Sequence, residues 1–161
     1  MAKRSLENKK ILIVDDEPDV LDSLEEILEG YTLSRAESFE AANALLQKEQ
    51  FDIAILDIMG VDGYQLLETA NKKGVICVML TAHALSPDNI KKSYTGGACS
   101  YIPKEEMINI ESFLEDVLEA KEEGKNPWTR WYSRLAGFCQ EKFGPDWDKD
   151  EKEFWDKMIY H

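Results

Sequence analysis

Short apolar runs alternate with amphipathic segments along most of this chain of 161 residues. The first run, Ile11–Val14, is rich in β-branched side chains, and apolar residues at helical spacing follow it between Val20 and Leu28. A continuous β-branched run is typical of a strand that is buried on both faces of a parallel sheet. The alternation therefore predicts parallel strands that are joined by helices.

The alternation of strand and helix occurs five times. After the first pair, we predict strands at about 31–36, 51–56, 75–80 and 98–102, and helices at about 38–50, 63–73, 86–96 and 105–122. Five strands with short links predict an α/β fold, in which a doubly wound open parallel sheet of the flavodoxin-like class has right-handed crossovers. In such sheets ligands bind beyond the carboxyl ends of the strands, where loops and helix N-termini converge.

Side chains suited to phosphoryl chemistry stand at these predicted strand ends. They are Asp15, Asp16, Asp57, Thr81 and Lys104. Crowded carboxylates raise each other's pKa unless a cation neutralises them, and a hard divalent ion such as Mg²⁺ suits carboxylate oxygens. A carboxylate can attack phosphorus, while a hydroxyl and an ammonium group can bind phosphoryl oxygens. Each residue alone would more often be a helix cap or a solvated side chain, but the five together favour the chemical interpretation.

Four sequence blocks at these positions resemble the signature blocks of a known family. The blocks are Ile11–Asp16, Ile55–Asp57, Leu80–Ala82 and Tyr101–Lys104. They look like those of the response regulator receiver domains of two-component signal transduction, and the resemblance covers about residues 8–122. It implies a flavodoxin-like receiver fold, and we expect residues 1–123 to form the receiver domain.

The resemblance implies that Asp57 accepts a phosphoryl group. The donor would be a sensor histidine kinase or a phosphotransfer protein. Mg²⁺ would be held by the carboxylates of Asp15, Asp16 and Asp57. The backbone carbonyl of Met59 would be the remaining protein ligand of the metal.

The resemblance also implies roles for residues on the last two strands. Thr81 and Lys104 would bind the phosphoryl oxygens. Tyr101 would be an aromatic switch that turns inward when Thr81 moves. The chain would be a phosphoacceptor with self-catalysed phosphotransfer and dephosphorylation, and not a conventional enzyme.

Two segments depart from the family pattern. The loop Asp57–Gly63 is two residues shorter than the commonest family loop, and Gly60 stands where proline is frequent. Family members usually carry proline in a cis peptide after the lysine, whereas Glu105 follows Lys104 here. A cis bond before a residue other than proline costs roughly 2.5–4 kcal/mol, so a cis peptide cannot be assumed here and the sequence leaves the conformation of the Lys104–Glu105 peptide open.

Two residues are candidates for the rim of the site. His83 lies two residues beyond Thr81, where receiver side chains often tune the lifetime of the phosphoryl group, although a solvated loop histidine is as good an interpretation. The apolar side chain of Met59 occupies a similar position and would hinder an attacking water.

The composition changes after Gly124. Residues 124–161 hold all four tryptophans, Trp128, Trp131, Trp147 and Trp155. We expect a two-helix, aromatic-rich C-terminal extension that starts at Asn126–Pro127, breaks at Gly144–Pro145 and resumes at a capping box of Asp148 and Glu151. So much aromatic surface requires packing on the receiver, on a second copy or on a partner, and packing within the molecule is the leading expectation.

The charge excludes some partners. The net charge of -13 lies in residues 1–123, since residues 124–161 hold seven basic and seven acidic side chains. Such a chain is a poor candidate for direct nucleic-acid binding and suits a cation or a basic protein face. Neither an apolar signal core nor a run near the ~20 residues that cross a bilayer is present, so we expect a cytoplasmic protein without membrane association. Three cysteines without a C-x-x-C pattern indicate neither a disulfide framework nor a zinc site.

Three classes of function remain open from the sequence. The favoured one is a phosphorylation-controlled signalling switch that acts on a downstream protein target, or on itself, through the tail. The alternative is a receiver-like protein-interaction module that works without phosphorylation. A third is a hydrolase or phosphatase that uses Asp57 as a nucleophile, although the sequence has no feature of a substrate pocket or lid.

Overall fold

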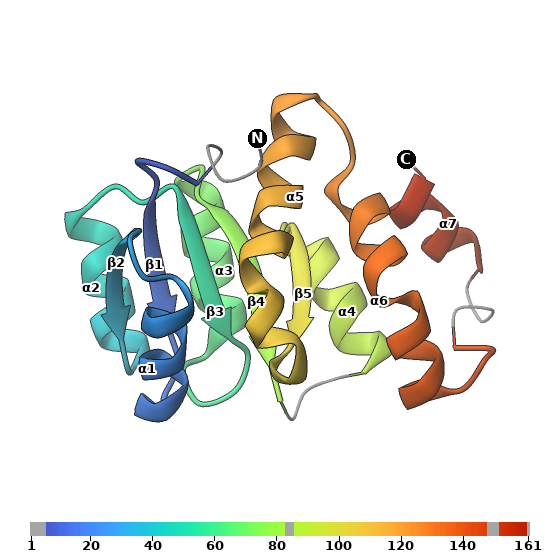
Figure 1. The fold of residues 1–161 in the computed structure, drawn as a ribbon, viewed down its shortest axis with the longest axis horizontal. Coiled ribbons are helices and arrows are strands. Elements are labelled where there is room, and N and C mark those ends of the chain that lie inside the picture. The colour runs from blue at the N-terminus through green and yellow to red at the C-terminus, as the bar shows by residue number, and fades with distance from the viewer. Residues whose placement is uncertain (1–5, 83–85, 148–151, 161) are drawn as a thin grey trace.

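A five-stranded parallel sheet organises the molecule, as the sequence predicts. The computed structural model describes residues 6–82, 86–147 and 152–160 (Figure 1). The strands are β1 (Lys10–Val14), β2 (Thr32–Ala36), β3 (Ile53–Asp57), β4 (Ile76–Thr81) and β5 (Ser100–Pro103). Their order across the sheet is β2-β1-β3-β4-β5, which confirms the doubly wound architecture and makes β5 an edge strand.

Helices cover both faces of the sheet. They are α1 (Pro18–Ile27), α2 (Phe39–Lys48), α3 (Gly63–Lys72), α4 (Pro87–Thr95) and α5 (Ile110–Glu122). In Figure 1, α1 and α5 lie in front of the sheet and α3 lies behind it. Side-chain caps define two of their starts, because Ser38 Oγ accepts the Ala41 N–H and Ser86 Oγ accepts the Asn89 N–H, each at 3.1 Å.

The predicted helix over 105–122 is wrong in its first part. Lys104–Asn109 forms the 3₁₀ helix η2, and α5 begins only at Ile110. No residue of η2 is buried, whereas Ile110 is fully buried. The α-helix therefore begins where its apolar face first reaches the sheet, since packing and not propensity supplies most of the stability of such a helix.

The core consists of the central strands and the helix faces that contact them. Ile11–Val14 and Ile53–Leu56 are almost completely buried, as expected for strands that are covered on both faces. Cys77 lies in β4, and Cys99 is buried immediately before β5. Both are buried free thiols, as expected for cysteines that form no disulfide framework.

The C-terminal segment forms two helices that pack on the receiver portion. They are α6 (Pro127–Phe143) and α7 (Lys152–Tyr160). Asn126 caps α6 at the predicted position, because its Oδ1 accepts the Trp128 N–H at 3.0 Å. In Figure 1, α6 runs beside β5 and α5, and α7 lies on the outer side of α6. The predicted capping box of Asp148 and Glu151 lies outside the described residues.

Aromatic side chains join the tail to the edge of the sheet. Trp128 Nε1 donates to the carbonyl oxygen of Ala98 at 3.0 Å, and Trp131 Nε1 donates to that of Tyr101 at 2.7 Å. Tyr94 of α4 makes edge-to-face contacts with Trp128 of α6 and Phe154 of α7, with ring centroids 5.9 and 5.8 Å apart. The tail thus covers the edge strand β5 and satisfies both buried indole N–H groups.

Little large apolar surface remains exposed. Among the residues that the structure describes, only Met59 and Ile108 are large hydrophobic side chains with high exposure, at 59% and 76%. Of the helices in the described ranges, none has the length and apolarity needed to cross a membrane.

Candidate functional site

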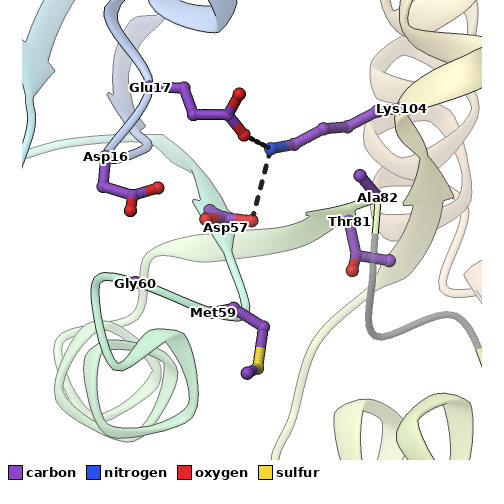
Figure 2. Close-up of a pocket in the computed structure, with 8 residues that line it drawn as sticks. All are labelled: Asp16, Glu17, Asp57, Met59, Gly60, Thr81, Ala82 and Lys104. Atoms are coloured by element: carbon purple, nitrogen blue, oxygen red, sulfur yellow. Dashed lines mark hydrogen bonds and ion pairs between the residues drawn. The ribbon is translucent and has the colours of Figure 1, made fainter.

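A pocket of about 200 Å³ lies at the carboxyl ends of the strands, where the sequence places the candidate residues (Figure 2). It is lined by Asp16, Glu17, Asp57, Met59, Gly60, Thr81, Ala82 and Lys104. Asp15 is 1% exposed and contacts Lys104. The structure therefore brings together all five residues that the strand ends predict.

Lys104 is the electrostatic centre of the site. Its Nζ lies 2.9 Å from Asp15 Oδ2, 3.2 Å from Glu17 Oε1 and 3.6 Å from Asp57 Oδ1. Burial lowers the pKa of Lys104, but the hydrogen bond to Asp15 and the charges of Asp57 and Asp15 raise it more, so that the pKa is above its ordinary value. The ammonium group is therefore charged at neutral pH and faces three carboxylates.

Asp57 ends β3 and is 5% exposed. Burial, followed by the negative charge of Asp15, raises the pKa of Asp57 to about 7, although Lys104 opposes the shift. Asp57 is thus ionised only in part at neutral pH. A second positive charge in the pocket would favour the carboxylate form, which is the form that can act as a nucleophile.

Asp15 is held from two sides at the end of β1. Its Oδ1 accepts the backbone N–H of Glu17 at 2.9 Å, and its Oδ2 faces Lys104. Burial raises the pKa of Asp15 even though both contacts lower it. The positive charge of Lys104 therefore neutralises the negative charge of the pocket's carboxylates only in part.

The donor set fits a hard divalent cation. One carboxylate oxygen each from Asp15, Asp16 and Glu17 can be chosen so that all lie within 4.8 Å of one another. Oxygen ligands of this type are those that Mg²⁺ prefers. Sequence analysis missed Glu17, although three consecutive acidic residues after a strand were a signal that could have included it.

The register of the sheet brings the remaining predicted residues together. Thr81 pairs with Pro103 across β4 and β5, so that Thr81 and Lys104 are neighbours at the same edge. Thr81 is 1% exposed and lines the pocket. Tyr101 is fully buried two residues before Pro103, and its backbone carbonyl is the one that Trp131 contacts.

The two unusual segments have definite conformations. Gly60 and Asp62 of the shortened loop both have positive φ, at 80° and 52°. The described residues contain no cis peptide bond, so the Lys104–Glu105 peptide is trans. Met59 lies on the rim of the pocket with its side chain exposed. His83 lies outside the described residues.

This sheet order, together with acidic residues after β1, Asp57 at the end of β3 and Lys104 after β5, defines a class of signalling module. The family model of the response regulator receiver domain matches residues 11–115, and the chain belongs to this family. Receiver domains are signalling modules and not conventional enzymes, and in general they work with histidine kinases. Here the acidic cluster of the receiver is Asp15, Asp16 and Glu17.

Individual relatives agree with this assignment. The heme response regulator HssR of Staphylococcus aureus is 37% identical over 101 residues, which are 58% of this chain and 43% of that protein. The chain thus spans less than half the length of the curated relatives it matches. A receiver domain protein from Methanospirillum hungatei, described as CheY-like, has 34% identity and a TM-score of 0.65 over 72% of this chain and 98% of that one. Chemotaxis protein CheY4 of Vibrio cholerae has 28% identity and a TM-score of 0.55 over 60% and 86%.

Proposed function

We propose that Asp57 accepts a phosphoryl group from a sensor histidine kinase or a phosphotransfer protein, and that the chain acts as a conformational signalling switch. The observation that carries this proposal is the position of Asp57, which is nearly buried in a pocket where Lys104 Nζ lies 3.6 Å from its Oδ1. An oxygen of Asp57 would form the new bond to phosphorus. The bond between phosphorus and the donor nitrogen would break, and its electron pair would return to that nitrogen.

The other residues of the pocket support this transfer. Asp15, Asp16, Asp57 and the backbone carbonyl of Met59 would hold Mg²⁺, which supplies positive charge against the carboxylates and the phosphoryl oxygens. Lys104 and the hydroxyl of Thr81 would bind the phosphoryl oxygens and orient the group.

We further propose that residues 1–123 act as the receiver and residues 124–161 as its output element. The strand β5 joins the two, because Lys104 follows it at the pocket and the Tyr101 carbonyl accepts Trp131 at its outer side. An ion pair of 3.1 Å between Glu105 and Lys142 adds a second link. Tyr101 would be the switch residue, and a movement of Thr81 and Lys104 toward a phosphoryl group would change how the tail packs. The altered tail would then bind a downstream protein or a second copy.

A direct test of the chemistry is intact-mass measurement after incubation with Mg²⁺ and a small-molecule phosphodonor. We expect one phosphoryl addition to the wild type and none to Asp57→Ala. The same experiment distinguishes this function from a second candidate, a receiver-like interaction module that works without phosphorylation. The shortened Asp57–Gly63 loop and the trans Lys104–Glu105 peptide favour that candidate, and absence of any addition would support it.

Two rim residues are proposed to set the lifetime of the phosphoryl group. Met59 is exposed beside the pocket, where an apolar side chain would hinder the attacking water. We expect Met59→Asn to change the dephosphorylation rate, and His83→Ala tests the same role for the histidine. Unchanged rates in both variants would remove these residues from the mechanism.

Tryptophan fluorescence tests the output role of the tail. All four tryptophans lie in residues 124–161, so the emission of the whole chain reports on that segment alone. We expect the emission to change when a phosphoryl mimic binds the wild type and to stay constant in Asp57→Ala. A constant emission in both proteins would contradict the coupling between the pocket and the tail.

A further inference from the structure

Gly60 lies against the carboxylate of Asp16, in the loop that joins β3 to α3 (Figure 2). A Cβ built on Gly60 would lie 2.4 Å from Asp16 Oδ2, 2.5 Å from its Cγ and 2.7 Å from its Oδ1. These separations are too short for a Cβ atom and the non-bonded atoms around it. A residue with a side chain fits at position 60 only if the loop or the carboxylate moves.

The loop is fixed at both of its ends. Ile58 and Val61 are 5% and 1% exposed, so both anchor the loop in the core. The Gly63 N–H donates to the Ile58 carbonyl at 3.1 Å. A Cβ on Gly63 would lie 2.0 Å from the backbone oxygen of Asp57, which shows how tightly the shortened turn closes. The backbone of Gly60 therefore has little freedom to move away from Asp16.

Asp16 is the partner that is free to move. Its side chain is exposed, and within residues 6–82, 86–147 and 152–160 its carboxylate makes no hydrogen bond or ion pair. An exposed side chain loses rotamer freedom when it becomes a metal ligand, and a contact that already restricts it reduces that loss. The backbone of Gly60 supplies such a contact.

We propose that Gly60 is a positioning residue for the cation site. Because it has no side chain, the shortened loop passes close enough to confine the Asp16 carboxylate to the pocket, beside Asp15 and Asp57. The inference rests on the proposed function, since it concerns the same Mg²⁺ site. It also gives the shortened loop a physical role, because a short loop brings the backbone of Gly60 against the side chain of Asp16.

The chain contains a matched control for this proposal. Gly60 and Gly74 have φ of +80° and +78°, but a Cβ on Gly74 would meet nothing within 4 Å. Gly60→Ala and Gly74→Ala therefore impose the same left-handed strain, and only the first also meets Asp16. By isothermal titration calorimetry of the full chain with Mg²⁺ alone, we expect Gly60→Ala to weaken binding by about tenfold or more, the scale seen when a group that orients a metal ligand is lost. Gly74→Ala should bind Mg²⁺ as the wild type does.

The variant Asp16→Ala separates the contact from the strain. It removes all three atoms that the new Cβ would meet. In the metal-free wild-type background we expect Gly60→Ala to lower the Tm at most slightly more than Gly74→Ala does, because the exposed Asp16 carboxylate can rotate away from the new Cβ. In the Asp16→Ala background the two substitutions should lower the Tm equally. This thermal measurement also covers the case in which Gly60→Ala folds poorly, because Asp16→Ala should then restore folding.

The outcomes distinguish this inference from the proposed function. Equal Mg²⁺ affinities of Gly60→Ala and Gly74→Ala, or an excess cost of Gly60→Ala that persists without Asp16, would overturn the positioning role and leave the phosphoacceptor function standing. Failure of the wild type itself to bind Mg²⁺ would overturn both.

Discussion

The strand β5 meets two regions of opposite chemistry. At its carboxyl end, Lys104 faces Asp15, Glu17 and Asp57 in a pocket that is open to solvent. Along its outer side, the strand is covered by the buried side chains of Trp128 and Trp131. The charge balance of the first region changes with any cation or anion that binds. The two indole side chains of the second region carry no charge, so their contacts depend on the geometry of the strand.

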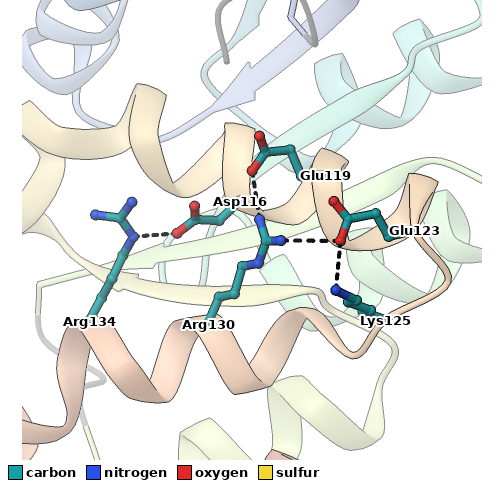
Figure 3. Close-up of polar contacts among 6 residues, drawn as sticks. All are labelled: Asp116, Glu119, Glu123, Lys125, Arg130 and Arg134. Carbon is teal, nitrogen blue, oxygen red and sulfur yellow. Dashed lines mark hydrogen bonds and ion pairs between the residues drawn. The ribbon is translucent and has the colours of Figure 1, made fainter. Parts of the chain in front are cut away.

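The tail region is itself divided into an aromatic centre and a charged margin. Figure 3 shows the margin, in which side chains of α6 pair with carboxylates of α5. Arg130 lies 2.6 Å from Glu119 and 3.5 Å from Glu123, and Arg134 pairs with Asp116. These side chains are partly exposed, so the aromatic centre should contribute far more stability than the margin.

The largest effect is therefore expected from the aromatic centre. Trp131 is 2% exposed and donates to the Tyr101 carbonyl at 2.7 Å. We expect Trp131→Ala to lower the free energy of unfolding by about 3–5 kcal/mol, the usual cost of truncating a buried large aromatic side chain. Urea denaturation of the full chain, followed by circular dichroism, measures this change.

Trp131→Phe is the matched control. It keeps most of the apolar ring and removes the N–H donor, so that the loss should be about 1–2 kcal/mol. A cost of Trp131→Ala below that of Trp131→Phe would contradict the assignment of the aromatic centre as the main contact of the tail.

The pocket should show the opposite behaviour, in that removal of its charge stabilises the protein. The folded-state pKa of Asp57 is raised to about 7 from the ordinary 3.8. Between these values the folded protein binds more protons than the unfolded chain, so its stability falls as pH rises. We expect the free energy of unfolding of metal-free Asp57→Asn to gain about 2.5–3 kcal/mol relative to the wild type between pH 5 and pH 8, because the slope of ~1.4 kcal/mol per pH unit levels off near pH 7.

Thermal or urea denaturation in a chelator at several pH values measures this difference. If the difference in stability between Asp57→Asn and the wild type is the same at pH 5 and pH 8, Asp57 does not titrate in that range. The contrast between the pocket and the aromatic side of β5 would then have no electrostatic basis.

The sequence predicted these two regions with unequal success. Asp57, Thr81 and Lys104 could be placed together because parallel strands bring their carboxyl ends to one edge, and the structure puts them there. Glu17 was missed, since its contact with Lys104 depends on the path of a turn and not on the position of a strand. The contact between Gly60 and Asp16 was also beyond the sequence, because it depends on how tightly the loop closes.

The tail shows a second limit on what could be predicted from the sequence. The sequence predicted an aromatic-rich helix that begins at Asn126–Pro127, and Trp128 and Trp131 of this helix are buried. The aromatic composition indicates that these side chains are covered, but it does not indicate what covers them. Packing on a second copy or on a partner therefore remained open beside packing on the receiver. Hydrogen bonds from the two indoles to backbone carbonyls could not be read from side-chain types, since any strand edge offers carbonyl groups. The 3₁₀ segment Lys104–Asn109 was missed because its residue types also suit an α-helix.

The smallest effect is expected from the charged margin of the tail. Arg130 is 31% exposed and Glu119 is 37% exposed, so Arg130→Ala should cost only about 0.5 kcal/mol at low salt. In 1 M NaCl, where the screening length falls to about 3 Å, the difference from the wild type should shrink further. The control is Lys72→Ala, which removes an ion pair with Glu68 within α3, far more exposed and unconnected to the tail. A loss for Arg130→Ala as large as that for Trp131→Ala, and insensitive to salt, would mean that charge and not aromatic packing holds the tail on β5, and a charged ligand could then control the tail directly.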